Sequence, residues 1–450
     1  MSASDVGSIY ASRTRKSRAL YAKAARLFPG GINHNIRYFE PHPFFVTRSK
    51  GKKLYDSDGN SYTDYWMGHW ALILGHSPPE VSSALARQAK NGTLVGTANT
   101  ASIELADLIQ KLAPGAELMR FSSTGSEATM YATRLARAKT GRRVIAKAIG
   151  GWHGFNDALL QTVNYPFEAD EGPGLLQDEG QFVESIPFND LESSLKILET
   201  IKDDLACIII EPLLAGAGCI PSNDDYLKGL QEFANKNGSL FILDEIVTGF
   251  RLTLGTAAGL YGLQPDLFTL GKIVGGGMPI GVVCGKKEIM SLADPVQRKE
   301  KQVRCAIGGG TFSANPMTMV AGAATLEFLK KNKLRVYSKL ERLGEAARLG
   351  IQKIFDDSGI ACRVTGAGSL FMPHFLAAGQ QDIVNATDVA LSNRSTLLSY
   401  HMALMSLNNI FFLPGKLGAF SFAHDQTDLW KLLEASRSFA RSLKPAVKNA

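Results

Sequence analysis

Two acids and a lysine in this chain each come directly after a short apolar run. These are residues 207–210 followed by Glu211, residues 240–243 followed by Asp244, and residues 267–270 followed by Gly271 and Lys272. Parallel strands end at a common sheet edge, where open α/β folds bind ligands, so we expect these side chains to converge. A lysine among glycines and apolar residues can be desolvated, which lowers its pKa and makes the neutral amine available for a Schiff base. The alternative is a lysine that extends to the surface, but this would not need the three glycines at residues 275–277. A buried carboxylate needs a partner, which is either a ligand atom or a structural cation such as Arg251.

Glycine clusters mark further candidate binding segments, and the 44 glycines in 450 residues exceed the usual share of about 7%. In the loop at residues 121–128, Thr124 and Glu127 have capping-box spacing, which predicts a helix start. A helix N-terminus offers backbone N–H groups to an anion, although this segment taken alone favours the alternative of an ordinary cap. A second loop, at residues 308–316, combines glycines with hydroxyl side chains that suit an anion.

A third cluster surrounds Trp152 and His153, between Gly151 and Gly154. Glycines on both sides let the backbone turn and present a flat ring for stacking, whereas a lone tryptophan is more often part of the core. Together the segments suit a ligand with an anionic group, a flat ring, a ring atom that needs a carboxylate, and an aldehyde that needs a lysine. Pyridoxal 5′-phosphate has all four.

The elements that position these residues follow from hydrophobic patterning. A chain of 450 residues favours two domains, and its middle alternates helical patterns with uniformly apolar runs. That pattern predicts an α/β fold with a mostly parallel central sheet. We expect residues 1–70 to form an N-terminal helix and part of a small domain, residues 71–328 the large domain, and residues 329–450 the rest of the small α+β domain.

Composition excludes several classes of protein. The 49 basic and 42 acidic residues give a net charge of +7 without a basic stripe, so we expect no nucleic-acid partner. The five cysteines are odd in number and lack metal-ligand spacing, so we expect neither disulfides nor a metal. No apolar stretch is long enough for a membrane span and the N-terminus is not a secretory signal, so we expect a cytoplasmic protein.

At this point the chain resembles the class III, fold-type I pyridoxal-phosphate aminotransferases, from about residue 27 to residue 329. Residues 244–251 are similar to the family's D-E-V-x-T-G-F-R segment, and residues 270–272 to its lysine segment. Residues 123–128 resemble its phosphate loop, and residues 310–316 its G-T-x-S-x-N-P motif. The branch that the chain most resembles holds glutamate-1-semialdehyde aminomutases and β-amino-acid aminotransferases.

The resemblance implies a role for each matching residue. Lys272 would be the Schiff-base lysine and Asp244 the partner of the pyridinium nitrogen. Trp152 and Ile246 would cover the two faces of the ring. The remaining cofactor-binding residues would be Thr124, Gly125, Ser126, His153, Glu211 and Thr311. The family's shared sites imply that Thr311 comes from the neighbouring subunit, so we expect a homodimer.

The substrate side separates two activities of the branch. Arg37 matches a family arginine that holds the substrate carboxylate, although an exposed surface arginine is an equally good interpretation. His34 stands where the aminomutases have a serine. Trp70 is a candidate residue of the substrate pocket. Residues 412–424 lack the aminomutase glutamate, and Lys416 falls nearest to it. The sequence therefore favours an aminotransferase that moves the amino group of a β-amino acid or simple amine to pyruvate or 2-oxoglutarate. The alternatives are the aminomutase and a non-catalytic pyridoxal-phosphate-binding protein, against which the retention of Lys272 and Asp244 argues.

Overall fold

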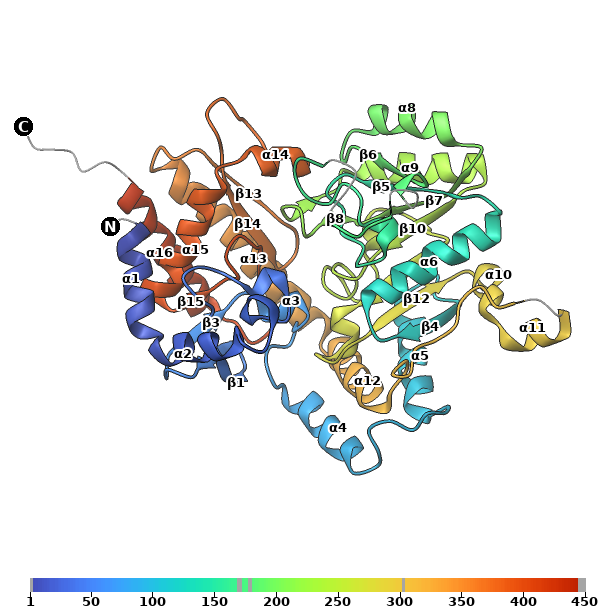
Figure 1. The fold of residues 1–450 in the computed structure, drawn as a ribbon, viewed down its shortest axis with the longest axis horizontal. Helices are drawn as coiled ribbons and strands as arrows, with labels where there is room; N and C mark the ends of the chain where they lie inside the picture. Colours follow the sequence, from blue (N-terminus) through green and yellow to red (C-terminus); the bar gives the residue numbers. More distant parts are fainter. Residues whose placement is uncertain (1–2, 168–171, 177–179, 302–303, 444–450) are drawn as a thin grey trace, which may run out of the picture. The chain divides into compact units, whose positions relative to one another are not determined.

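The computed structural model describes residues 3–167, 172–176, 180–301 and 304–443, drawn in colour in Figure 1. The chain divides into two compact units. Unit 1 comprises residues 1–78, 338–382 and 391–450, and unit 2 comprises residues 79–337 and 383–390. Both chain ends thus belong to one unit. The boundaries between the units lie at residues 78 and 337, whereas the sequence analysis placed them at residues 70 and 328.

Unit 2 contains a seven-stranded sheet in the order β4-β12-β11-β10-β7-β5-β6 (Figure 1). Its strands are β4 (Leu118–Ser122), β5 (Val144–Ala148), β6 (Val183–Ile186), β7 (Leu205–Ile210), β10 (Leu240–Asp244), β11 (Leu267–Gly271) and β12 (Gly281–Gly285). Strand β12 is antiparallel to β11 and β4, while the pairings from β11 to β6 are parallel. A short antiparallel pair, β8 (Leu213–Leu214) and β9 (Ile220–Pro221), lies outside this sheet.

The three apolar runs at residues 207–210, 240–243 and 267–270 form strands β7, β10 and β11, which lie next to one another in this sheet. Every residue of β7, β10 and β11 is buried. Helices on both faces exclude water from a parallel sheet, which explains why these strands carry no polar alternation. The prediction of an α/β fold with a mostly parallel sheet is confirmed.

Unit 2 also contains helices. They are α4 (Pro79–Ala89), α5 (Thr100–Leu112), α6 (Gly125–Thr140), α8 (Leu191–Ile201), α9 (Asp224–Asn237), α10 (Lys287–Met290), α11 (Pro295–Lys301), α12 (Pro316–Lys331) and α14 (Ala386–Leu391), with the 3-10 turns η3 (Asp157–Leu159), η4 (Ala257–Leu260), η5 (Lys272–Gly275) and η6 (Ser291–Ala293). Helix α6 packs on strands β7, β11 and β12, because its small and apolar residues face the sheet. Helix α13 (Lys333–Asp356) crosses from unit 2 into unit 1.

Unit 1 has two smaller sheets. One has the order β1-β2-β3-β15 and the other β13-β14-β16. The strands are β1 (Val46–Lys50), β2 (Lys53–Asp56), β3 (Ser61–Asp64), β13 (Cys362–Thr365), β14 (Leu370–Phe375), β15 (Ile410–Phe411) and β16 (Gly418–Ala419). The helices are α1 (Ala3–Arg13), α2 (Arg15–Ala24), α3 (Met67–Trp70), α15 (Arg394–Asn408) and α16 (Gln426–Leu443), with 3-10 turns η1 (Pro29–Gly31) and η2 (Asn35–Arg37). Strand β15 pairs with β3 across nearly 350 residues of sequence.

One feature of unit 1 differs from the sequence pattern. The sequence analysis expected one N-terminal helix within residues 1–70, but the structure has α1 and α2, which are separated at Thr14. The carboxylate of Asp58 accepts hydrogen bonds from the backbone N–H groups of Lys16 and Ser17, at 2.6 and 2.9 Å. It thereby caps the first turn of α2 from outside the helix. Hydrophobic periodicity cannot show a cap that another segment supplies.

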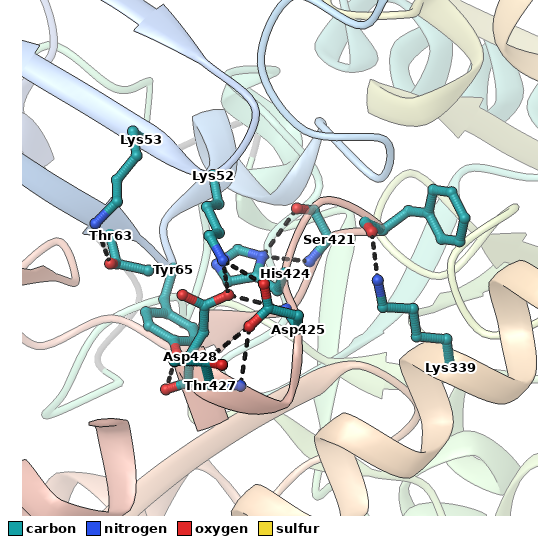
Figure 2. Close-up of polar contacts among 11 residues, drawn as sticks. Lys52, Lys53, Thr63, Tyr65, Lys339, Ser421, His424, Asp425, Thr427 and Asp428 are labelled. Carbon is teal, nitrogen blue, oxygen red and sulfur yellow. Dashed lines mark hydrogen bonds and ion pairs between the residues drawn. The ribbon is translucent and has the colours of Figure 1, made fainter. Parts of the chain in front are cut away.

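An ionic cluster connects the first strands of unit 1 to its last helix (Figure 2). The Lys52 ammonium lies 2.6 Å from the carboxylate of Asp425 and 2.5 Å from that of Asp428. The Tyr65 hydroxyl donates to the backbone carbonyl of Asp428, at 3.0 Å. Within the described part of the chain no helix is long and apolar enough to span a membrane.

Candidate active site

The loop before α6 has the geometry of an anion site. The Thr124 hydroxyl accepts a hydrogen bond from the Glu127 N–H, and the Glu127 carboxylate accepts from the N–H groups of Ser123 and Thr124 at 2.8 and 2.9 Å. The predicted helix start is therefore present, with a complete capping box. Among the residues that the structure describes, nothing bonds the next two N–H groups, those of Gly125 and Ser126. They remain available at the positive end of the helix dipole.

The glycine-flanked Trp152 loop lies against the start of α6. Gly154 has a φ of +90°, and a Cβ there would lie 2.4 Å from the Ser126 hydroxyl oxygen, so only glycine fits. The Ser126 hydroxyl accepts a hydrogen bond from the Phe155 N–H, at 3.1 Å. Trp152 keeps 38% of its surface exposed, and its ring meets Phe155 edge-on. The ring is thus presented beside the anion site and is not part of the core.

Asp244 ends strand β10 and is almost fully buried. One carboxylate oxygen accepts from the Thr269 hydroxyl at 2.8 Å and from the Ile246 N–H at 3.1 Å. The other lies 2.7 Å from Nδ1 of His153. Burial lowers the pKa of His153, so the imidazole is neutral and donates its Nδ1–H to the carboxylate. Its Nε2 has no hydrogen-bond partner among the described residues.

The other two acids at this edge are buried as well. Burial, together with the charge of Asp244, raises the pKa of Glu211 to about 8. Its carboxyl oxygens accept from the backbone N–H groups of Trp152 and Ala215, at 3.1 and 3.3 Å. Burial also raises the pKa of Glu245 to about 7, and its carboxylate accepts from the Thr248 hydroxyl at 2.6 Å. Glu245 is held by its own loop, whereas Glu211 fastens the Trp152 loop to the sheet.

Lys272 directly follows β11 and has a left-handed φ of +47°, a conformation that costs a non-glycine residue free energy. Burial lowers the pKa of its amine, and the charges of Asp244 and Glu211 only partly oppose that shift. Ile246 lies close by, because a Cβ added to Gly125 would meet its Cδ1 at 2.6 Å and a Cβ on Gly271 would meet its Cγ2 at 3.2 Å. Unit 2 therefore brings the predicted cofactor-binding residues of three loops together.

The predicted substrate residues belong to unit 1. His34 and Arg37 lie in the segment around η2, with Arg37 exposed and His34 partly buried. Trp70 is buried, and its indole N–H donates to the Leu417 carbonyl at 3.1 Å. Thr311 lies exposed on the loop before α12 in unit 2.

Sequence reasoning missed Thr269, whose hydroxyl holds Asp244. In the parallel pairing of β10 and β11 these two residues are direct register partners. A hydroxyl inside the apolar run of residues 267–270 was the available signal, because a buried polar group needs a partner. The register that identifies the partner came only with the tertiary structure.

These residues fit pyridoxal 5′-phosphate. Unsatisfied helix N–H groups suit the phosphate, a buried carboxylate suits the ring nitrogen, an exposed indole suits the ring, and a desolvated lysine suits the aldehyde. No cluster of residues able to hold a metal ion occurs in the described part of the chain. The sheet and site together define an enzyme of the pyridoxal-phosphate-dependent fold-type I class.

Comparison with known proteins identifies the family. The model of the aminotransferase class-III family matches residues 37–401. Over 425 residues, the chain is 39% identical to the glutamate-1-semialdehyde 2,1-aminomutase of Archaeoglobus fulgidus, covering 93% of this chain and 98% of the relative. The chain belongs to the class III aminotransferases, whose cofactor is pyridoxal 5′-phosphate.

Solved structures of similar fold include transaminases. A β-phenylalanine aminotransferase from Variovorax paradoxus is 30% identical, with a TM-score of 0.88, and the match covers 98% of this chain and 97% of that one. A transaminase with pyridoxal phosphate bound is also 30% identical, with a TM-score of 0.86 and coverage of 95% and 98%. Relatives of both activities therefore share the whole fold with this chain.

Proposed function

We propose that the protein moves an amino group by pyridoxal-phosphate chemistry centred on Lys272. The observation that carries this proposal is the desolvated Lys272 amine close to two buried acids, Asp244 and Glu211. When bound, the cofactor accepts the electron pair left when a substrate C–H bond beside the nitrogen breaks. The Lys272 amine, with its lowered pKa, can take the proton from the substrate carbon and return it.

The neighbouring residues would hold the cofactor in place. Gly125 and Ser126 would bind the phosphate through their backbone N–H groups, and Trp152 and Ile246 would enclose the ring. Asp244 would keep the ring nitrogen protonated, with His153 and Thr269 fixing the orientation of its carboxylate. Thr311 from a second subunit would complete the phosphate site, which requires a homodimer. Two measurements on the Thr311→Ala variant test this requirement. Its molecular size in solution should remain that of a dimer, and its affinity for the cofactor should fall.

For the overall reaction, the comparisons favour the 2,1-aminomutase over the intermolecular aminotransferase that the sequence favoured. The support is the 39% identity to a curated aminomutase over nearly the full length of both chains. In this reaction one carbon skeleton is retained and the amino group moves to a neighbouring carbon. We place glutamate-1-semialdehyde first among the substrates.

A specific observation keeps the aminotransferase as the second candidate. The segment at residues 412–424 contains no glutamate and places the cation of Lys416 there instead. His34 also departs from the aminomutase pattern. In this reaction a β-amino acid or simple amine would donate the amino group to pyruvate or 2-oxoglutarate.

One experiment separates the two candidates. Purified holoenzyme is incubated with glutamate-1-semialdehyde alone, and separately with 3-aminobutyrate plus 2-oxoglutarate or pyruvate. Formation of the isomer without an added keto acid supports the aminomutase. Formation of glutamate or alanine only in the second mixture supports the aminotransferase. If wild-type holoenzyme yields no product in either mixture, both proposals fail.

A further inference from the structure

A cavity within unit 2 is lined by three arginines, Arg120, Arg134 and Arg304. Its volume is about 480 Å³. Strand β4 carries Arg120, helix α6 carries Arg134, and Arg304 belongs to the segment between α11 and α12. Among the residues that the structure describes, none of those that line the cavity is acidic. The wall of the cavity therefore concentrates positive charge.

The packing of α6 on the edge of the sheet brings two of these arginines together. Helix α6 contacts both β4 and the 3-10 turn η6, and the Arg120 guanidinium donates to the carbonyl of Ala293, the last residue of η6, at 2.9 Å. Burial raises the pKa of Tyr131, the charge of Glu127 adds to the increase, and the charges of Arg120 and Arg134 both oppose it. The two guanidinium groups therefore act on the same side chain of α6.

Two acids of the surrounding segments are engaged by backbone groups. The Glu127 carboxylate accepts hydrogen bonds from N–H groups at the start of α6, and the Asp294 carboxylate accepts one from the Val296 N–H at 2.8 Å. Neither Arg134 nor Arg304 has a hydrogen-bond or ion-pair partner for its side chain in the described part of the chain. An anion between these guanidinium groups would relieve their mutual repulsion.

The backbone adds hydrogen-bond donors to the same cavity. Gly308 and Gly309 line it, and both are exposed. No acceptor for their N–H groups occurs among the residues described. Because glycine has no side chain, a ligand can approach such N–H groups closely. Backbone donors beside guanidinium groups are a combination that suits phosphate oxygens.

The cavity is separate from the loop that we assign to the cofactor phosphate. That phosphate would bind at the N-terminus of α6, at Gly125 and Ser126. Arg134 follows Gly125 by nine residues of the helix, which is about 13 Å along its axis at about 1.5 Å per residue. The two anion sites therefore lie at different levels of one helix, and both belong to unit 2.

We propose that the cavity of Arg120, Arg134 and Arg304 binds the phosphate group of a small organic molecule other than the cofactor. Guanidinium groups are planar and always charged, and each can give a phosphate two parallel hydrogen bonds. A volume of about 480 Å³ is in the range of small-molecule sites and exceeds the size of one phosphate group, which favours an organic phosphate over free phosphate. The proposal does not depend on the reaction at Lys272.

Calorimetric titration of the holoenzyme, freed of unbound cofactor, tests the proposal with the cofactor phosphate site already filled. Glycerol 3-phosphate should bind more tightly than inorganic phosphate, and uncharged glycerol should not bind. Citrate shows whether any multiply charged anion is accepted, and it should bind more weakly than the phosphate ester. The proposal is overturned if glycerol 3-phosphate does not bind, or if it binds no more tightly than inorganic phosphate or citrate.

Variants of one arginine test which groups hold the ester. Arg134→Gln should weaken binding of glycerol 3-phosphate about tenfold, because charge-assisted hydrogen bonds are lost. Arg134→Lys keeps the charge but not the paired hydrogen bonds, so its affinity should be intermediate. Arg87→Gln is the matched control, because Arg87 is an exposed arginine of α4 outside the cavity. Its affinity should stay within about twofold of wild type. Equal binding by Arg134→Gln and wild type would refute the proposal.

A cysteine in the cavity wall gives a readout that needs no variant. Cys305 lines the cavity, and it is the one cysteine of the five that is not buried. Iodoacetamide should therefore alkylate Cys305 first, and saturating glycerol 3-phosphate should slow this reaction at least about fivefold, as measured by mass spectrometry of the peptides. Unchanged alkylation with the ester bound would place the ester elsewhere. A Cys305 that does not react in ester-free holoenzyme would show that the cavity is covered. Either result overturns the proposal.

Discussion

In unit 1 the Lys52 ammonium lies between two carboxylates within 2.6 Å, whereas in unit 2 burial lowers the pKa of the Lys272 amine although Asp244 and Glu211 act on it. In the first cluster the opposite charges satisfy one another. In the second, Asp244 accepts from a neutral histidine and from the Thr269 hydroxyl, and Glu211 accepts from the backbone N–H groups of Trp152 and Ala215. The difference teaches that direct carboxylate contacts keep the Lys52 ammonium charged, whereas burial lowers the pKa of Lys272, a kind of shift that is typical of functional sites.

The largest effect should come from the unit 2 lysine. Lys272→Ala should reduce turnover by at least about 10³-fold, because the group that moves the proton is lost. Cofactor binding should persist, since the phosphate loop and Asp244 remain. Turnover assays and cofactor absorbance after dialysis measure the two effects. Lys286→Ala is the matched control, because that half-exposed lysine is paired with Asp266, at the other end of β11 from Lys272. Full activity of the Lys272 variant would refute the assignment.

The next effect concerns the carboxylate that ends β10. Asp244→Asn retains the shape of the side chain but removes its negative charge, so turnover should fall by about 10²–10³-fold, as when other electrostatic contacts to a reacting group are removed. The Thr269 hydroxyl can still donate to the amide oxygen, and the amide NH2 can donate to Nδ1 of His153 in its other neutral tautomer, so the fold should persist. Steady-state kinetics measure the loss of turnover, and circular dichroism shows whether the fold persists. A turnover within twofold of wild type would show that Asp244 is structural.

A pH series tests whether Glu211 is strained. Its folded-state pKa of about 8 lies above the ordinary value of 4.5, so the folded protein binds the extra proton and loses stability as pH rises from about 5 to about 8. Glu211→Gln removes this dependence. Both proteins are compared without cofactor. The melting temperature of Glu211→Gln minus that of wild type should increase from about pH 5 to about pH 8 and stay constant above that pH. A constant difference between the two proteins at all pH values would contradict the pKa shift.

The smallest effect belongs to the paired cluster of unit 1. The hydrogen bond from Lys52 lowers the pKa of Asp425 to about 2. The ionised Asp425 therefore stabilises the folded protein above about pH 4, and this contribution is lost as the pH falls toward 2. Because Asp425 is half-exposed, solvent screening limits the contribution to less than about 1 kcal/mol. Urea unfolding of Asp425→Asn should show this small loss at pH 7 and none at pH 2, with turnover unchanged. A large loss of turnover would contradict a purely structural role.

Local patterns were enough for the strands and loops of unit 2. The apolar runs at residues 207–210 and 240–243 became adjacent strands, since buried parallel strands must be continuously apolar. The capping box at Thr124 is equally local, because both partners lie within four residues. The break at Thr14 was not predictable, because the cap comes from Asp58 in another segment.

The amino-acid sequence by itself determined the fold class, the cofactor chemistry and the residues at the ends of the strands, because these depend on hydrophobic period and on motifs within single segments. The tertiary structure decided which charged and polar side chains are partners. It showed that Asp244 is bound to His153, over 90 residues earlier in the chain. Partners so far apart in sequence meet only through strand register and loop packing, and burial then sets the pKa values that local patterns cannot reveal.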